Sequence, residues 1–567
     1  MSAQNTDQHR DLILEAKERG RGATFKAYLK LSGPGWLQSA ITLGGGSLAG
    51  SLYLGIIGGY EMMWLQPLMM IFGIVMLSAI AYVALSTGER PFRALNEHVN
   101  PVLGWTWIVA TMMANLVWAM PQFSLGTAAL RQNLGLFTFN GGEFVCAVLL
   151  LIVSALVVWL YDASSRGYRV FDILLKLMVG IVVLSFFMVV LMLATGEGGL
   201  PWGQILSGFI PDPGLLFHPT DSLRELVEQS SAPDYWQATV VSAQRDRMVA
   251  AAATAVGINM TFLLPYSMMK RGWDRNFRGL ARFDLATGLF VPFVFATSFV
   301  VIAAASQFHA KPEPGLLNMH AVSGESADLI PAKLKKAYEE NLEKMLQASE
   351  RKTDQATMAA LPEADRILAA TLIERDAFAL ANSLQEFAGK HGAQIVFGIG
   401  VVGMAVSSII ILMLINGFVV CEMMNRPMGG WPYRLGCLLP ALSGAFGALY
   451  LWSGKAKFYL AVPTSRFGMV LLPIAYIAFF CMMNNRKLLG EDMPRGGTRI
   501  AWNVLMAIGV LLALIGAAVS IFNDTTTIPN TEIYVRNIAL FILGTLVFLA
   551  IAVHFVRGKR NKEINPD

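Results

Sequence analysis

Stretches of apolar residues, each near 20 residues long, recur along most of the chain and are separated by shorter polar segments. A helix needs about 20 apolar residues to cross a bilayer. Alternation with a period of two, which would indicate strands, is absent from these stretches. The pattern therefore predicts an all-α, polytopic membrane protein with twelve transmembrane helices. They are expected at residues 34–57, 62–85, 103–130, 143–161, 169–195, 248–269, 283–306, 392–424, 430–452, 461–484, 499–522 and 533–556.

Lysine and arginine residues indicate how these spans cross the membrane. With the N-terminus inside, the inside segments carry 25 of them and the short outside loops carry four. Positive charge accumulates on the cytoplasmic side of membrane proteins. We therefore expect both termini to be cytoplasmic, in a plasma membrane or a bacterial inner membrane, which requires an even number of spans.

The polar segments and the spans together suggest a division of the chain. Within the outside segment 307–391, Leu334, Tyr338, Leu342, Met345 and Leu346 recur at helical spacing, which predicts a helical cap. A partner-binding role of this cap is the less favoured interpretation. The expected parts are an N-terminal segment (1–30), a first repeat of five spans (31–195), an outside loop (196–247), a second repeat (248–484) interrupted by the cap (307–391), and two last spans with a cytoplasmic tail (485–567).

Composition narrows the class of protein. Of the 567 residues 55% are hydrophobic and 15% are charged, which excludes an ordinary soluble enzyme. The net charge of +5 is no sign of a nucleic-acid partner, because the basic residues flank the spans. The polar N-terminus indicates that no cleavable signal peptide is present. We find no nucleophile–base pair, metal-ligand spacing or cofactor motif, so neither an enzyme nor a cofactor is expected.

Two spans contain helix breakers at mid-membrane depth. Span one carries Gly44, Gly45 and Gly46, followed by Ser47, and span six carries Pro265. Successive glycines make a helix easy to unwind, and proline removes a backbone donor. Spans one and six are corresponding members of a five-plus-five inverted repeat, in which paired interruptions indicate a transporter's central site. The alternative is that each breaker only kinks its helix.

These residues resemble the natural resistance-associated macrophage protein (NRAMP) family of divalent-metal transporters. The resemblance rests on "GPGWLQSAITLGGGS", "LLPYS", "DAFALANSLQEFAGKHGAQIVFGIGVVGMAVSS" and "LLPIAYIAFFCMMNNRKLLG". It implies the inverted-repeat fold of leucine-type amino-acid transporters, with discontinuous helices one and six. It also implies alternating-access transport of a divalent metal, which is proton-linked in that family.

The motif positions depart from the family. Its metal-binding Asp and its Asn become Gly44 and Ser47, and acidic residues of its third helix become Met120 and Phe123. Leu264 replaces its metal-selecting methionine, and Tyr266 and Ser267 replace its His and Asn. A desolvated divalent cation needs compensating charge, which these residues lack.

Hydroxyls, amides and carbonyls remain as candidate ligands. With Leu264, the candidates are the carbonyls of Gly44, Gly45 and Gly46 and the side chains of Thr42, Ser47, Asn259, Thr261, Tyr266 and Ser267. Half-helix N-termini near Ser47 and Ser267 would favour a polar or anionic group. The metal therefore stays unassigned from the sequence.

Further polar residues lie within or beside the spans. Ser407 and Ser408 of span eight are a candidate site for a coupling ion, Na⁺ in particular, or they bond carbonyls of their own helix. Asp172 and Lys176 are four residues apart and are expected to pair. Asp284 is expected at the membrane interface.

Three functions remain from the sequence. The first is an NRAMP-like secondary transporter, by resemblance of a divalent metal ion. The second is an Na⁺- or H⁺-coupled transporter of a small polar or anionic organic solute. The third, of another class, is a non-transporting membrane receptor or scaffold.

Overall fold

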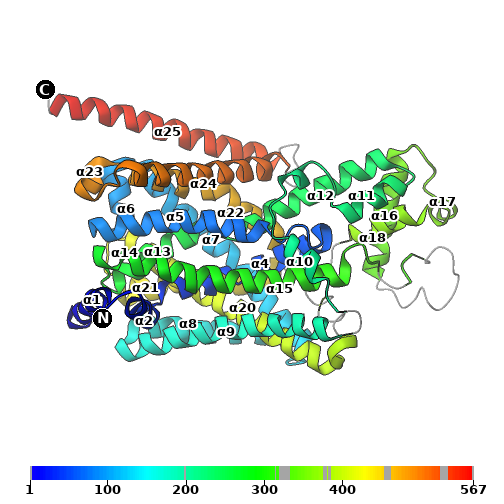
Figure 1. Cartoon of the computed structure of the whole chain (residues 1–567), viewed down its shortest axis with the longest axis horizontal. Coiled ribbons are helices and arrows are strands. Elements are labelled where there is room, and N and C mark those ends of the chain that lie inside the picture. The colour runs from blue at the N-terminus through cyan, green and yellow to red at the C-terminus, as the bar shows by residue number, and fades with distance from the viewer. Residues whose placement is uncertain are drawn as a thin grey trace.

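The structure, a computed structural model, describes residues 3–196, 199–312, 315–317, 332–373, 380, 385–451, 461–523 and 534–564. Within these residues the chain is a bundle of long helices with no β-strand, so the protein is an all-α, polytopic membrane protein. Figure 1 shows the long helices running side by side, with both ends of the chain at one end of the bundle and a smaller helical group at the other. We call the first end the terminal face.

The helices of the bundle follow the predicted spans. Nine are long and apolar enough to cross a membrane within the described residues, and eleven are if each of two bent pairs counts as one span. The predicted span 430–452 corresponds to α21 (Gly430–Phe446) and a π-helical turn (Gly447–Leu451), which fall outside that count. The other main helices are α5 (Leu65–Thr87), α7 (Pro101–Ala128), α8 (Gly142–Ala163), α9 (Ser165–Thr195), α15 (Val291–Phe308), α20 (Gln385–Met423), α22 (Ala461–Met483), α24 (Gly496–Phe522) and α25 (Val535–Ile564).

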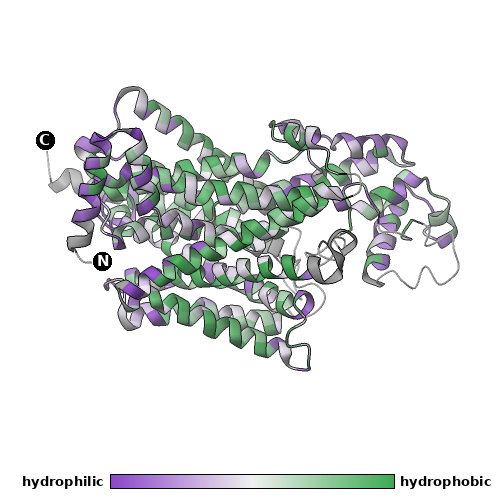
Figure 2. Ribbon diagram, turned by 60° about the horizontal axis from the view of Figure 1, so that its bottom comes forward, coloured by the Kyte–Doolittle hydropathy of each residue, from purple (hydrophilic) through white to green (hydrophobic). Residues whose placement is uncertain are grey.

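Apolar residues cover the outside of this bundle as well as its interior (Figure 2). Large side chains such as Leu184 of α9, Leu511 of α24 and Phe541 of α25 are exposed. In water such surface would drive association, but it is the surface that lipid requires. Helix α20 packs against α7, α9 and α21 in the interior, where its polar residues are buried.

The first predicted interruption is present. Span one consists of α3 (Pro34–Thr42) and α4 (Gly45–Gly58), which are bent by 57°. Gly44 is extended, and an added Cβ there would lie 2.5 Å from Ser408 Oγ. The glycine run therefore allows both the bend and the close approach of α20.

The second interruption lies elsewhere than predicted. Four residues (254–257) separate α12 (Pro233–Ala253) from α13 (Ile258–Lys270), and Pro265 lies inside α13. The predictions of a break at Pro265 and of a half-helix N-terminus near Ser267 are wrong. A membrane helix can contain proline, because its neighbours re-satisfy the freed carbonyl. The N-terminus of the half-helix is at Gly257.

The helical group opposite the terminal face has its own apolar core. The predicted apolar face of α16 (Ala332–Ala348) is buried there, with Tyr338 and Leu342 fully enclosed. Trp236 of α12 enters the same core, so residues 233–247, predicted as loop, are helical and join the cap to span six. The remaining elements of this end are α10 (Trp202–Ser207), a 3₁₀ turn (Pro213–Leu216), α11 (Asp221–Gln229), α17 (Gln355–Ala359) and α18 (Glu363–Thr371).

Short helices gather at the terminal face. Asp284, expected at the membrane interface, is buried within the protein at this face and accepts hydrogen bonds from the backbone N–H of Gly33 (3.0 Å) and Gly35 (2.6 Å) at the start of α3. This carboxylate compensates the positive end of a helix. The elements here are α1 (Ala3–Glu18), α2 (Arg21–Leu31), α6 (Pro91–Ala94), α14 (Arg278–Leu285), α23 (Arg486–Leu489), π-helical turns (Leu95–Val99, Ala286–Phe290) and 3₁₀ turns (Arg275–Phe277, Gly490–Asp492). A further π-helical turn (Ala129–Asn133) ends α7 at the opposite end of the bundle.

Candidate functional site

A small cavity lies where the two interrupted helices face each other. Its volume is about 50 Å³, and no ionisable side chain lines it. Polar atoms reach it from both interruptions and from α7. The lining residues are Ile41, Thr42, Gly44, Gly46, Ser47, Trp118, Pro121, Gln122, Ala253, Thr254, Gly257 and Met260.

Side chains hold the backbone of the first interruption. Gln122 Oε1 of α7 accepts a hydrogen bond from Gly45 N (2.8 Å). The Ser47 hydroxyl accepts from Gly44 N (3.1 Å) and donates to Gly44 O (2.9 Å). Buried backbone groups outside a helix need such partners. The N–H groups of Gly44 and Gly45 are therefore satisfied by side chains.

Ser407 and Ser408 of α20 were predicted either to bind a coupling ion or to bond carbonyls of their own helix, and the two residues differ in this respect. Ser408 Oγ lies 3.3 Å from Ala40 O and 3.4 Å from Ile41 O, so it faces the end of α3. Ser407 Oγ donates to Met404 O (3.2 Å) of its own helix. Only Ser408 is thus placed beside the interruption.

Thr42 and Met260 bring the two interrupted helices together. Thr42 Oγ1 is 3.1 Å from Met260 Sδ and donates to Gln38 O (2.8 Å). Gln38 Nε2 in turn donates to Met260 O (3.2 Å). The other amide atom, Gln38 Oε1, is buried without a hydrogen-bond partner in the described residues. A hydroxyl and a thioether therefore lie 3.1 Å apart, and the free amide oxygen belongs to the residue one helical turn before Thr42.

Backbone contacts and the wall of α7 shape the second interruption. Thr254 Oγ1 donates to Ala251 O (2.6 Å), and Gly257 N lies 3.4 Å from Met260 Sδ. An added Cβ at Gly257 would lie 2.3 Å from the Trp118 ring. Glycine is required here by close packing, since its backbone is extended and unstrained.

Asn259 and Thr261 point away from the cavity, toward α7. Asn259 Nδ2 donates to Asn115 Oδ1 (3.2 Å), and Asn259 Oδ1 accepts from Met260 N (2.9 Å). Thr261 Oγ1 accepts from Trp107 Nε1 (2.9 Å). Buried polar side chains bonded in this way hold helices together in a membrane.

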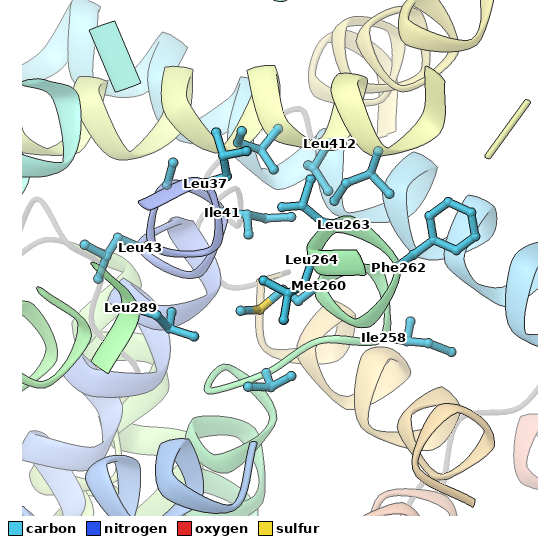
Figure 3. Close-up of a cluster of buried hydrophobic side chains, with 14 of the residues drawn as sticks. Leu37, Ile41, Leu43, Ile258, Met260, Phe262, Leu263, Leu264, Leu289 and Leu412 are labelled. Carbon is cyan, nitrogen blue, oxygen red and sulfur yellow. The ribbon is translucent and has the colours of Figure 1, made fainter. Parts of the chain in front are cut away.

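Leu264 lies in an apolar layer on the terminal-face side of the cavity. Figure 3 shows its residues, of which Leu264 and Leu412 are 1% exposed. Such a layer excludes water and ions. We call it the apolar plug, and it consists of Leu37 and Ile41 from α3, Leu263 and Leu264 from α13 and Leu412 from α20.

Tyr266 and Ser267 lie further along α13, beyond the plug. The Tyr266 hydroxyl accepts from Phe92 N (3.2 Å), and its ring stacks on Phe262 with centroids 4.2 Å apart. Ser267 Oγ donates to Leu264 O (2.8 Å) of its own helix. Phe92 also lines a larger cavity of about 1020 Å³ at the terminal face.

The geometry thus separates the predicted residues into two groups. Thr42, Gly44, Gly46 and Ser47 line the cavity and Gly45 contacts Gln122, whereas the five predicted residues of α13 do not line it. Sequence reasoning missed Gln38, Trp118, Thr254, Gly257 and Met260, and treated Gln122 only as a helix contact. The signal was Gly257 after a run of alanines, which places the break, and hence Met260, one turn before Leu264.

Ionisable residues that are able to hold a metal gather elsewhere. Within the described residues, Glu89, Glu97 and His98 form one such group, at the connection of α5 and α7. Arg93 pairs with Glu97 (2.7 Å), and His98 contacts Glu89 (3.3 Å). These contacts account for the group as a surface ion-pair network.

Comparison with known proteins identifies the family and the fold of this chain. The sequence model of the natural resistance-associated macrophage protein-like family matches residues 35–323 and 360–519, which is most of the chain. This chain belongs to that family. The NRAMP match includes both interruptions, and all the residues that line the small cavity between them fall within its first part, 35–323. The members of this family are integral, multi-pass membrane proteins that transport metal ions, and the family is one of transporters rather than of enzymes. This chain is therefore a metal-ion transporter.

Individual NRAMP relatives are distant. A manganese transporter, pdt1 of Schizosaccharomyces pombe (strain 972 / ATCC 24843), is 24% identical over 217 residues, which cover 36% of this chain and 40% of that protein. A crystal structure of the Eremococcus coleocola manganese transporter in complex with an aromatic bis-isothiourea substituted compound is 14% identical, with a TM-score of 0.60 over 93% of this chain and 94% of that one. A histidine-to-alanine mutant of that transporter has the same identity and a TM-score of 0.62 over the same shares. These structures share the fold.

Proposed function

We propose that this chain carries a divalent cation, with Mn²⁺ as its first candidate, through the cavity between the interrupted helices by alternating access. The proposal rests on one observation: Thr42 and Met260 place a hydroxyl and a thioether 3.1 Å apart in the cavity wall where both helices open, with the free amide oxygen of Gln38 one helical turn before Thr42. The manganese transporters among its relatives support the choice of ion. The cavity is about 50 Å³, which suits an ion with little water better than an organic solute.

The donor set determines how such an ion is held. Neutral oxygens and a thioether do not balance two positive charges, so the ion keeps part of its hydration shell and binds weakly. A thioether is a soft ligand, which favours Mn²⁺ or Fe²⁺ over Mg²⁺ and Ca²⁺. None of the three donors titrates near neutral pH, so protons do not compete for them.

Release toward the terminal face requires two barriers to open. The apolar plug separates the cavity from α13's far end, and the Tyr266–Phe92 contact closes the bottom of the large cavity beyond it. We propose that α3 and α13 separate at these two layers in the inward-open state. Positive charge at the terminal face supports a cytoplasmic location of both termini and of release.

The coupling ion is a separate part of the proposal. Ser408 Oγ and the carbonyls of Ala40 and Ile41 offer three oxygens beside the first interruption. Such oxygens suit a monovalent ion. If Na⁺ binds there, Mn²⁺ uptake into proteoliposomes depends on a Na⁺ gradient, and Ser408→Ala loses that dependence while Ser407→Ala keeps it.

Selectivity at Met260 tests the main proposal. We expect wild-type protein in proteoliposomes to take up Mn²⁺ in preference to Ca²⁺. Met260→Ala removes the soft donor, so Mn²⁺ uptake at subsaturating concentration falls about tenfold and the preference over Ca²⁺ shrinks. Met404→Ala, a buried methionine of α20 outside the cavity lining, is the matched control. Saturable Mn²⁺ uptake with unchanged selectivity in Met260→Ala would contradict the assignment.

A further inference from the structure

A third cavity, of about 500 Å³, lies at the terminal face and takes no part in the transport path described above. It is enclosed by α1, α2, the junction of α8 and α9, and the end of α13, at the end of the bundle where both termini lie (Figure 1). We call it the basic cavity. Its size admits a phosphate ester with room for water.

Positive charge exceeds negative charge in this cavity. Two carboxylates, Asp162 and Asp172, line it together with five cationic side chains, so three positive charges are in surplus. Buried Asp284 lies behind the wall, and counting it as an anion still leaves two. The cationic side chains are Lys30, Arg169, Lys176, Lys270 and Arg271.

The inner cations are already paired. Asp172 binds Arg271 and Lys176, each at 2.8 Å, which confirms the predicted Asp172–Lys176 pair. Arg271 Nε also donates to Tyr168 Oη (2.6 Å). These contacts satisfy the deep wall of the cavity with charge-assisted hydrogen bonds.

The outer cations have no such partner. Lys30 and Arg169 are exposed at the mouth, and neither forms an ion pair with any of the described residues. They come from different elements, α2 and α9. Two unpaired cations facing one cavity lower their repulsion by sharing an anion.

His9 reports the same surplus of positive charge. It lines the cavity on α1, and its pKa lies below the usual 6.5 because of burial first and then the charges of Arg271 and Lys30. The N-terminus of the long helix α9 adds positive potential, since Ser164 lines the cavity and caps Gly167 N (3.0 Å).

We propose that the basic cavity binds a phosphate group, which bridges Lys30 and Arg169. This binding stabilises the state in which α3 is closed against α9. The phosphate would hold the start of α3 in place, as two hydrogen bonds in the structure already do. Lys176 Nζ donates to Ser32 O (2.9 Å), and Arg271 donates to Leu31 O (3.3 Å), so α9 and α13 hold the entry to α3. Only the effect on transport depends on the proposed function.

Two sources supply this chemistry. Exposed Val170 and Ile173 on α9 lie beside Arg169 on the lipid side, so an anionic lipid headgroup can reach the mouth. A soluble phosphate ester can enter from the aqueous side. The two differ in whether an acyl chain is needed.

Thermal unfolding of the purified full chain tests the binding. Phosphatidylglycerol in mixed micelles, inorganic phosphate and ATP are added separately, with phosphatidylcholine and sodium chloride of equal ionic strength as blanks. The variant Lys30→Gln/Arg169→Gln is compared with Lys487→Gln/Arg499→Gln, which removes the same charge from exposed residues of α23 and α24 at the same end. All four side chains are exposed, so both variants are expected to fold.

We expect at least one phosphate probe to raise the unfolding temperature of the wild type and the control. The same probe binds the cavity variant roughly tenfold or more weakly, because two charge-assisted contacts are lost. A shift with phosphatidylglycerol alone identifies the lipid, and a shift with ATP or phosphate identifies a soluble ester. Equal shifts in the cavity variant and the wild type, or no shift with any probe, overturn the proposal. Since this readout needs no transport, its failure is distinct from failure of the proposed function.

Discussion

The two interrupted helices open the membrane core in different ways. In the first, side chains of neighbouring helices bind the opened backbone: Gln122 accepts from Gly45 N, and Ser408 faces the carbonyls of α3. In the second, the break between α12 and α13 is held mainly by short-range bonds such as Thr254 to Ala251 O. The first interruption is thus a recess held by neighbouring helices, and the second supplies the donor Met260. The comparison predicts which substitutions are most damaging.

The largest effect is expected at the glycines of the first interruption. A Cβ at Gly45 would lie 3.0 Å from Leu125 and 3.3 Å from Gln122, so Gly45→Leu fills the recess. Mn²⁺ uptake into proteoliposomes should be abolished with near-normal expression. Gly180→Leu, at a membrane glycine with open space around it, is the control and should transport normally. Unchanged uptake by Gly45→Leu would remove the recess from the transport path.

A smaller effect is expected from the side chains that support each interruption. Gln122→Leu leaves Gly45 N without its acceptor, which costs about 1–3 kcal/mol and lowers the uptake rate roughly tenfold or more. Asn115→Leu removes only the acceptor of Asn259 Nδ2, behind the second interruption, and should lower it less. Uptake rates and unfolding temperatures of both variants give the comparison. Equal losses in the two variants would show that the interruptions do not differ in this way.

Opening toward the terminal face should respond to Tyr266. Its hydroxyl accepts from Phe92 N beside the larger cavity and also bonds Glu422, so Tyr266→Phe removes both hydrogen bonds, of about 1 kcal/mol each, and leaves the ring stacked on Phe262. We expect faster reaction of a cysteine placed in the plug at Leu263 with a thiol reagent added from the terminal-face side. The same cysteine in otherwise unchanged protein is the control. A slower reaction in Tyr266→Phe would contradict this role.

The smallest effect concerns the outer ends of the two helices. Span six is continuous with the cap through α12. Span one contacts the cap through Glu61, whose carboxylate accepts a hydrogen bond from Asp221 N (3.0 Å) of α11. Burial, and then the charge of Asp221, raise the pKa of Glu61 from 4.5 to about 7. The folded state therefore keeps a proton that the unfolded chain has lost between these values. Stability should fall as pH rises through this window and then level off.

Unfolding temperatures between pH 4.5 and 8 measure this dependence. Glu61→Gln should flatten the decline, because the amide cannot ionise. Glu228→Gln, an exposed residue of α11, should retain the wild-type slope. The same slope in Glu61→Gln and wild type would show that the outer end of span one is not linked to the cap by this carboxyl group.

Much of the fold followed from the sequence because lipid restricts what a chain can do. Backbone groups in a bilayer must be satisfied within helices, so apolar stretches near 20 residues report spans directly. The apolar face of α16 and the pair of Asp172 and Lys176 followed from helical spacing in the same way. The break at Gly44 followed as well, since three successive glycines weaken a helix wherever they occur.

The site was decided by tertiary structure. Pro265 looked like a breaker, but whether a proline opens a helix depends on the neighbours that satisfy the freed carbonyl, and α13 stays helical there. The break at 254–257 follows from small residues that pack closely, with Gly257 against Trp118, and its sequence signal, a glycine after a run of alanines, is weaker than that of the proline eight residues later. Met260, Gln38 and Gln122 come from separate segments, and only the packing of α3, α7 and α13 gathers them. The sequence alone determined a helical membrane protein with an opened first span, because hydropathy and glycine content act locally. Which donors face that opening depends on contacts between distant segments, and only the folded bundle defines them.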